Sequence, residues 1–101
     1  MSQRHDVKIT VVRTLETGDL FDEHAGAGVT PTCTRVNAGQ VFVSRALQIP
    51  EGFCSWAWAD IQRDIVHLAL GGDFPLMKQR GMALACCTDG LRPVIFKLER
   101  V

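Results

Sequence analysis

The stretch that decides the fold is Ser55–Leu70, which reads SWAWADIQRDIVHLAL. Its large apolar residues recur at spacings of three and four, and this spacing places them on one face of a helix. Two glycines follow directly, and glycine readily adopts the left-handed conformation that commonly ends a helix. The sequence therefore predicts one long helix whose apolar face packs on a sheet. That face consists of Trp58, Ile61, Ile65 and Leu68.

Two strand regions are predicted before this helix. Residues 7–14 largely alternate apolar and polar side chains and are rich in β-branched residues, the pattern of a half-buried strand. A second region covers residues 33–45 and is clearest at 40–44. The intervening Asn37-Ala38-Gly39 is typical of a turn or a bulge. A short helix is also expected after Gly18, with Asp19 as its N-cap.

The last part of the chain is predicted to form a β-hairpin. Residues 81–88 and 93–100 are the two strands, and Asp89-Gly90 between them is a strong turn signal. This order of elements predicts an α+β fold, a small and mainly antiparallel sheet with one long helix packed on it. The helix is expected to contact one of two apolar sets, Val94, Phe96 and Leu98 or Met82, Leu84 and Cys86.

Length and composition set limits on the function. The 101 residues predict a single domain over residues 1–101, with 47% hydrophobic and 22% charged residues as in ordinary globular proteins. Eleven basic residues balance 11 acidic ones, which argues against nucleic-acid binding. No apolar run approaches the ~20 residues that cross a bilayer, so no membrane partner is expected. The N-terminal sequence has no secretory signal, and we expect a cytoplasmic protein.

The four cysteines suggest a thiolate site. In a reducing cytoplasm they are expected to be thiols or metal ligands rather than disulfides. Cys86 and Cys87 are adjacent on a predicted strand, so their side chains point to opposite faces and cannot both ligate one metal ion. A zinc or iron ion would be held by Cys33, Cys54 and one residue of the doublet, for which we name Cys86. The alternative is that the doublet is buried as small hydrophobic side chains.

Cys54 is the best candidate for a reactive thiol, whether for metal binding or for redox chemistry. It lies at the predicted start of the long helix, where unpaired N–H groups and the helix dipole stabilise a thiolate. Glu51 nearby opposes this effect by repelling negative charge. A purely structural role at the helix start is the alternative.

A second function class is a small enzyme that needs no cofactor. Its pocket would lie between helix and sheet, lined by the aromatic residues Phe53, Trp56 and Phe74, and would bind an apolar or partly apolar small molecule. Isomerisation or cyclisation is the natural reaction class. Cys54, Asp60 or His67 would act as acid or base, although Asp60 and His67 also fit a solvated helix face.

Two further expectations concern charge and assembly. Arg92 follows the predicted hairpin turn, where it could bind an anion or pair with Asp89. A small sheet leaves edges and apolar surface uncovered, so we expect a homo-oligomer. The plainest function is then an oligomeric accessory protein without catalysis.

Two motifs resemble a small family of prokaryotic proteins of similar length to which no activity is assigned. They are PEGFCSWAWADI at residues 50–61 and CCTDGLRPVIFKLER at residues 86–100. Shorter pieces around Val7–Val11, Cys33, Gly39–Val43 and Gly71–Pro75 also fit, so the resemblance covers most of the chain except residues 15–31. It implies a single-domain protein of this kind and no particular reaction.

Overall fold

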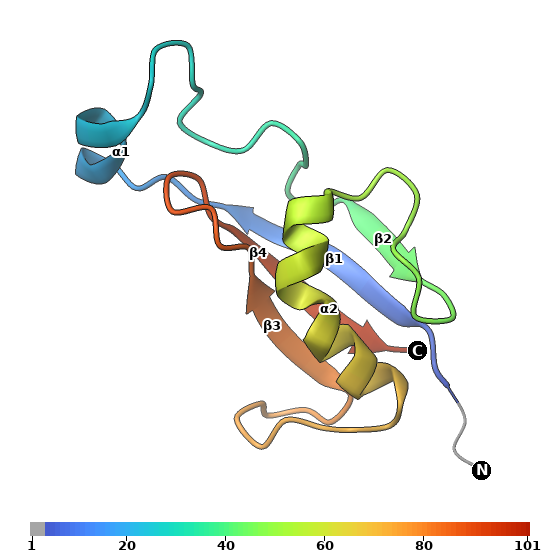
Figure 1. Ribbon diagram of the computed structural model, residues 1–101. Helices are drawn as coiled ribbons and strands as arrows, with labels where there is room; N and C mark the ends of the chain where they lie inside the picture. Colours follow the sequence, from blue (N-terminus) through green and yellow to red (C-terminus); the bar gives the residue numbers. More distant parts are fainter. Residues whose placement is uncertain (1–3) are drawn as a thin grey trace.

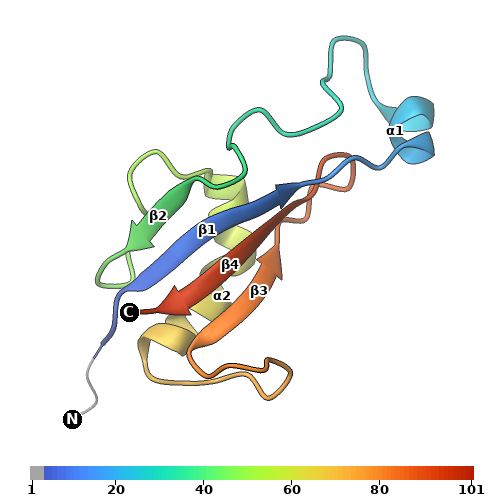
Figure 2. The same ribbon diagram turned by 180° about the vertical axis from the view of Figure 1, so that it is seen from behind.

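The computed structural model describes residues 4–101 and consists of a sheet with a long helix on one face. The four strands are antiparallel in the order β2-β1-β4-β3, and α2 crosses one face of the sheet (Figure 1). Seen from behind, the strands lie in front of α2 (Figure 2). The predicted α+β fold is confirmed. The elements are β1 (Val7–Thr14), α1 (Asp19–His24), β2 (Val41–Ser44), α2 (Ser55–Ala69), β3 (Met82–Cys86) and β4 (Val94–Arg100).

The core lies between α2 and the sheet. Ile61, Ile65 and Leu68 of α2 are fully buried, as the spacing predicted, and Trp58 is half-buried beside them. The sheet contributes alternate residues of β1 and β4, because successive side chains of a strand point to opposite faces. These sheet residues are Val7, Ile9, Val11, Val94, Phe96 and Leu98.

The face of β3 that turns toward α2 carries small side chains. Ala83 is buried and Ala85 is half-buried, whereas Leu84 is 50% exposed. Of the two apolar sets expected against the helix, the β4 set is therefore correct and the set of Met82, Leu84 and Cys86 is wrong. Alanines at this position allow α2 to approach β3 closely, since a larger residue would need more space.

The second strand region and the short helix begin elsewhere than predicted, and β3 ends two residues before the predicted strand 81–88. Residues 33–40 are not a strand, because Gly39 adopts a φ of 89° and the Gln40 N–H turns back to the Asn37 carbonyl oxygen at 3.0 Å. The pairing of β2 with β1 thus begins only at Val41. In α1 the N-cap is Gly18 rather than Asp19, and the helix contains no buried residue.

The molecule is elongated, with extents of 52, 29 and 20 Å. The segment that includes α1 extends beyond the end of the sheet where β1 ends and β4 begins (Figure 1). Within residues 4–101, no helix combines the length and the apolar character needed to cross a membrane.

Candidate functional site

A pocket of about 340 Å³ opens at the N-terminal end of α2. The first turn of α2 forms one wall, and the loop before β2 contributes a second through Cys33, Arg35 and Val36. The β3–β4 connection and the start of β4 close the remaining side. Three segments that are far apart in the sequence therefore meet at this place.

Three of the four cysteines line this pocket. Cys33, Cys54 and Cys87 come from the loop before β2, the N-cap of α2 and the residue after β3. Cys86 is exposed and does not line it. The reason is strand alternation, since Cys87 follows the inward Ala83 and Ala85 at a spacing of two. The predicted set of Cys33, Cys54 and Cys86 is thus not brought together, because Cys87 rather than Cys86 lines the pocket with Cys33 and Cys54.

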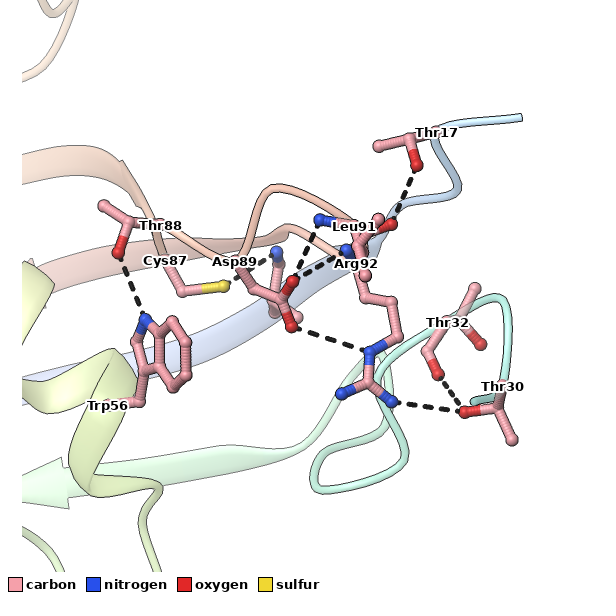
Figure 3. A network of polar contacts seen from close by, with 10 residues as sticks. Thr17, Thr30, Thr32, Trp56, Cys87, Thr88, Asp89, Leu91 and Arg92 are labelled. Carbon is pink, nitrogen blue, oxygen red and sulfur yellow. Dashed lines mark hydrogen bonds and ion pairs between the residues drawn. The ribbon is translucent and has the colours of Figure 1, made fainter. Parts of the chain in front are cut away.

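The two residues of the doublet have different environments. The Cys87 sulfur accepts a hydrogen bond of 3.3 Å from the Val94 N–H, which fixes it beside β4 (Figure 3). The Cys86 thiol donates to the Cys87 carbonyl oxygen at 3.2 Å. Desolvation, then the neighbouring Cys87 and the Asp60 carboxylate, raise the pKa of the Cys86 thiol. Cys86 therefore stays protonated at neutral pH and is a poor nucleophile.

The N-terminus of α2 has no side-chain cap among the described residues. Cys54 is the N-cap, with an extended backbone, and it makes no side-chain hydrogen bond to the first turn. The first turn also contains no acidic residue. First-turn N–H groups lack intrahelical partners and carry the positive end of the helix dipole. This wall of the pocket, formed by Cys54, Ser55, Trp56 and Ala57, therefore favours negative charge.

Arg92 adds a guanidinium group to the pocket. Asp89 Oδ1 accepts hydrogen bonds from the Leu91 and Arg92 N–H groups at 2.9 and 3.1 Å, which shapes the β3–β4 connection. Asp89 Oδ2 lies 3.5 Å from Arg92 Nε, so the expected ion pair is present. The Nη1 atom reaches Thr30 Oγ1 at 3.4 Å (Figure 3). Arg92 Nε is nevertheless buried without a hydrogen-bond partner in the described part of the chain.

Trp56 and Asp60 connect α2 to the β3–β4 connection through Thr88. The Trp56 indole N–H donates to Thr88 Oγ1 at 3.1 Å (Figure 3), while 61% of Trp56 remains exposed. Asp60 Oδ2 accepts from the Thr88 N–H at 2.7 Å, and both carboxylate oxygens lie 3.0 Å from the Thr88 hydroxyl. Asp60 is thus a structural anchor beside the pocket rather than one of the residues that line it.

The other predicted site residues are not brought to this pocket. Phe53 is 7% exposed and packs against Phe42 and Phe96 in the core, with ring centroids 4.9 and 5.5 Å apart. His67 lies near the opposite end of α2, roughly 20 Å from Cys54 at the helical rise of 1.5 Å per residue. Its ring contacts Phe74 at a centroid distance of 4.7 Å. The expected combination of Phe53, Trp56 and Phe74 around one ligand is absent from the described residues.

Sequence reasoning did not single out Arg35 or Thr88, and it left open which cysteine of the doublet faces the site. Strand alternation would have identified Cys87 once the inward face of β3 was known. Arg35 lies in an irregular loop and carries no pattern that points to a pocket. Among residues 4–101, no three His, Cys, Asp or Glu side chains are grouped closely enough to hold a metal ion.

The two motifs that resemble a prokaryotic family meet at the pocket. Residues 50–61 provide its α2 wall, and residues 86–100 provide Cys87, Asp89 and Arg92. Comparison of the chain with models of protein families, with curated proteins and with solved structures found no match. The family assignment thus stays a prediction.

Proposed function

We propose that the protein acts through a reactive thiol, Cys54, in a pocket that binds a small organic anion. The observation that supports this most is the pocket itself, which gathers three cysteines from distant segments beside two arginines. A structural cysteine needs only apolar neighbours. A thiol that must react needs access to solvent and positive charge nearby, and Cys54 is half-buried beside the uncapped start of α2.

The lining supports a ligand with one charged end. The first-turn N–H groups of α2 have no side-chain acceptor in the described chain, and an anionic group such as a carboxylate would supply one. Arg92 is ion-paired with Asp89 at 3.5 Å, but its Nε makes no hydrogen bond with any described residue, so the guanidinium can also face an anion in the pocket. Trp56, which is 61% exposed, offers apolar surface for the rest of the molecule, whereas Val94 and Phe96 of the lining are almost fully buried. This mixture of apolar wall and few convergent polar groups is typical of small-molecule sites.

Paired alkylating reagents test the proposal on the reduced native protein. Iodoacetate and iodoacetamide have the same reacting carbon, and each forms an S–C bond to the thiolate while iodide leaves. Only iodoacetate carries a carboxylate. We expect Cys54 to react at least tenfold faster than Cys86 with either reagent, followed by peptide mass spectrometry. We also expect the iodoacetate-to-iodoacetamide rate ratio to be higher at Cys54 than at Cys86.

A variant of the guanidinium separates thiol reactivity from anion recognition. Arg92→Gln keeps a polar side chain with an N–H donor at about the position of Nε and removes the charge. It should lower the iodoacetate rate at Cys54 severalfold and leave the iodoacetamide rate nearly unchanged. If Cys54 labels no faster than Cys86 with either reagent, Cys54 is structural and the proposal fails. If Cys54 is fast with both reagents but Arg92→Gln changes nothing, the anion part fails.

A soft metal ion is the second candidate, because Cys33, Cys54 and Cys87 line one pocket, although in the described structure they are not grouped closely enough to hold a metal ion. These thiolates would be its ligands, and their side chains would have to move together to reach metal distances. Zinc added before iodoacetamide should then protect all three cysteines at a stoichiometry of one ion per chain and leave Cys86 unprotected. Protection of Cys54 alone would contradict a shared site.

Compartment and assembly complete the proposal. We infer a cytoplasmic protein, since a reducing environment keeps all four cysteines as thiols, the form in which they are present here. We also infer that the chain forms a homo-oligomer through its uncovered sheet. The alternative of a cofactor-free isomerase or cyclase would have to use this same pocket, because His67 and Phe74 lie near the other end of α2.

A further inference from the structure

The edge strand β3 exposes a row of main-chain groups that have no partner in the part of the chain that the structure describes. The Cys87 N–H donates to the Val94 carbonyl oxygen at 3.0 Å, and the Arg100 N–H donates to the Gly81 carbonyl oxygen at 2.7 Å. Hydrogen-bonded residues alternate along an antiparallel pair, so Ala83 and Ala85 also face β4. The N–H and C=O groups of Met82, Leu84 and Cys86 therefore point away from β4, toward the open edge.

Nothing in the sequence of β3 protects this edge. The strand reads MALAC and contains neither a charged residue nor a proline, the two devices that most often keep exposed edges from pairing. Leu84 at its centre is 50% exposed and Cys86 is also exposed. In both views β3 forms one border of the sheet, and no strand of residues 4–101 lies beyond it (Figures 1 and 2).

We infer that β3 pairs antiparallel with β3 of a second copy of the chain, about a two-fold axis at Leu84. In this register Leu84 lies opposite Leu84 of the second copy, and Met82 lies opposite its Cys86. Every outward main-chain group of the strand then meets an outward group of the other copy. A shift by one residue would place outward groups against inward ones, and a shift by two would leave an end residue unpaired.

The second copy is favoured over an unrelated peptide by the chemistry of the edge. An uncharged strand offers an acidic or basic peptide no charge complement, whereas two leucines that meet on the axis bury each other's apolar surface. The chain has no formal net charge, so two copies do not repel each other over a distance.

A two-fold axis perpendicular to the sheet also keeps both α2 helices on the same face. The dimer is thus one continuous sheet with one helical layer.

Light scattering on the intact chain tests the dimer. The expected mass at micromolar concentration is twice the 11.1 kDa of the chain. Leu84→Lys places two like charges directly opposite each other and should weaken dimerisation at least tenfold. Val41→Lys is the matched control, because Val41 is 52% exposed on the other edge strand, and it should leave the mass unchanged.

Crosslinking tests the register. Leu84→Cys should form an intermolecular disulfide between the two copies of position 84 under mild oxidation, since opposed residues in such a pair lie about 5.5 Å apart at Cα. Val41→Cys should not, and peptide mass spectrometry distinguishes this link from links through the native cysteines. A mass of 11.1 kDa at every concentration would overturn the inference. So would a dimer that tolerates Leu84→Lys and does not crosslink at position 84. Neither Leu84 nor Val41 lines the pocket of Cys54, so these outcomes do not depend on the proposed function of that pocket.

Discussion

The C-terminal end of α2 is held by many polar contacts, whereas its N-terminal end forms one wall of the pocket that Cys33, Cys54 and Cys87 line. Arg100 Nη1 donates to the carbonyl oxygens of Leu68 and Gly72 at 3.1 and 2.6 Å, and Nη2 donates to Asp73 Oδ1 at 2.9 Å. The same Asp73 oxygen accepts from the Gly81 N–H at 2.6 Å. The last carbonyls of the helix and the loop after it are thereby satisfied within the chain.

The N-terminal end makes few such contacts. No side chain of residues 4–101 caps it, and Arg92 Nε in the same pocket makes no hydrogen bond in that range, although it is ion-paired with Asp89 at 3.5 Å. Native proteins pair nearly all buried polar groups, so an unpaired donor calls for an explanation. The comparison teaches that the C-terminal end is held by contacts within the chain, while the first-turn N–H groups at the N-terminal end have no side-chain partner among residues 4–101, as the proposed anion site requires. Changes at the two ends should therefore affect different measurements.

The largest effect is expected from Gly72→Ala at the C-terminal end. A Cβ at this position would overlap the ring of His67, which covers Gly72 closely. The ring would have to leave its contacts with Phe74 and with the Asp73 carbonyl oxygen. The free energy of unfolding, measured by urea denaturation, should fall by about 1 kcal/mol, the low end of the cost of overpacking, because His67 is exposed and its ring can rotate away. Gly90→Ala is the control, because nothing lies within 4 Å of a Cβ there, and equal losses in both variants would refute this account.

A smaller and pH-dependent effect is expected from Asp73→Asn. The Gly81 N–H and the Arg100 guanidinium stabilise the ionised carboxylate and lower the pKa of Asp73. A carboxyl whose folded pKa is below its unfolded value of about 3.9 stabilises the fold above that value. The contribution is lost as the pH falls through the folded pKa. The variant should thus be less stable than the parent at neutral pH, and the difference should shrink in acid.

Urea denaturation at several pH values measures this difference. Asp22→Asn is a suitable control, since Asp22 is exposed in α1, which contains no buried residue. A stability difference for Asp73→Asn that stays constant from neutral pH into acid would show that the charge of Asp73 is not what holds the loop.

The smallest effect on stability is expected from Cys54→Ser at the N-terminal end. Serine has nearly the same shape and is a preferred N-cap, so the free energy of unfolding should stay within about 0.5 kcal/mol of the parent. Alkylation in the pocket should nevertheless lose its fastest phase. A loss of stability comparable to that of Gly72→Ala would instead mean that both ends of α2 are structural.

The fold could be predicted wherever one pattern dominated. The three- and four-residue spacing in Ser55–Ala69 and the alternation in Val94–Arg100 each allow only one buried face, and both predictions are confirmed. The prediction that the strand region starts at residue 33 was wrong. The turn expected at Asn37-Ala38-Gly39 is present, and the backbone meets β1 only at Gly39 and Gln40, which exchange two hydrogen bonds with Val11. A local turn outweighed the weak strand propensity.

The site was only partly predictable. Cys54, Trp56 and Arg92 are predicted site residues, and all three line the pocket. For Cys54, its position directly before a long helix was enough to predict a site. Cys33 was named as its partner, but no periodicity connects residues so far apart in the chain. Asp60 and His67 are both polar residues of the same predicted helix, and no sequence pattern separates their roles. In the structure Asp60 binds Thr88 beside the pocket, whereas His67 contacts the loop that follows the C-terminal end of α2.

The sequence by itself determined the periodic features of this protein: the long helix and its buried face, the strands, and the helix stop, where Gly71 adopts a φ of 93°. These depend on interactions between residues a few positions apart, which a linear pattern records. Only the tertiary structure decided that Cys87 rather than Cys86 joins Cys33 and Cys54, and that β3 presents its outward groups at an open edge. The first depends on which face of β3 meets α2, and the second depends on the order of the strands in the sheet. Those are settled by packing between segments far apart in the chain.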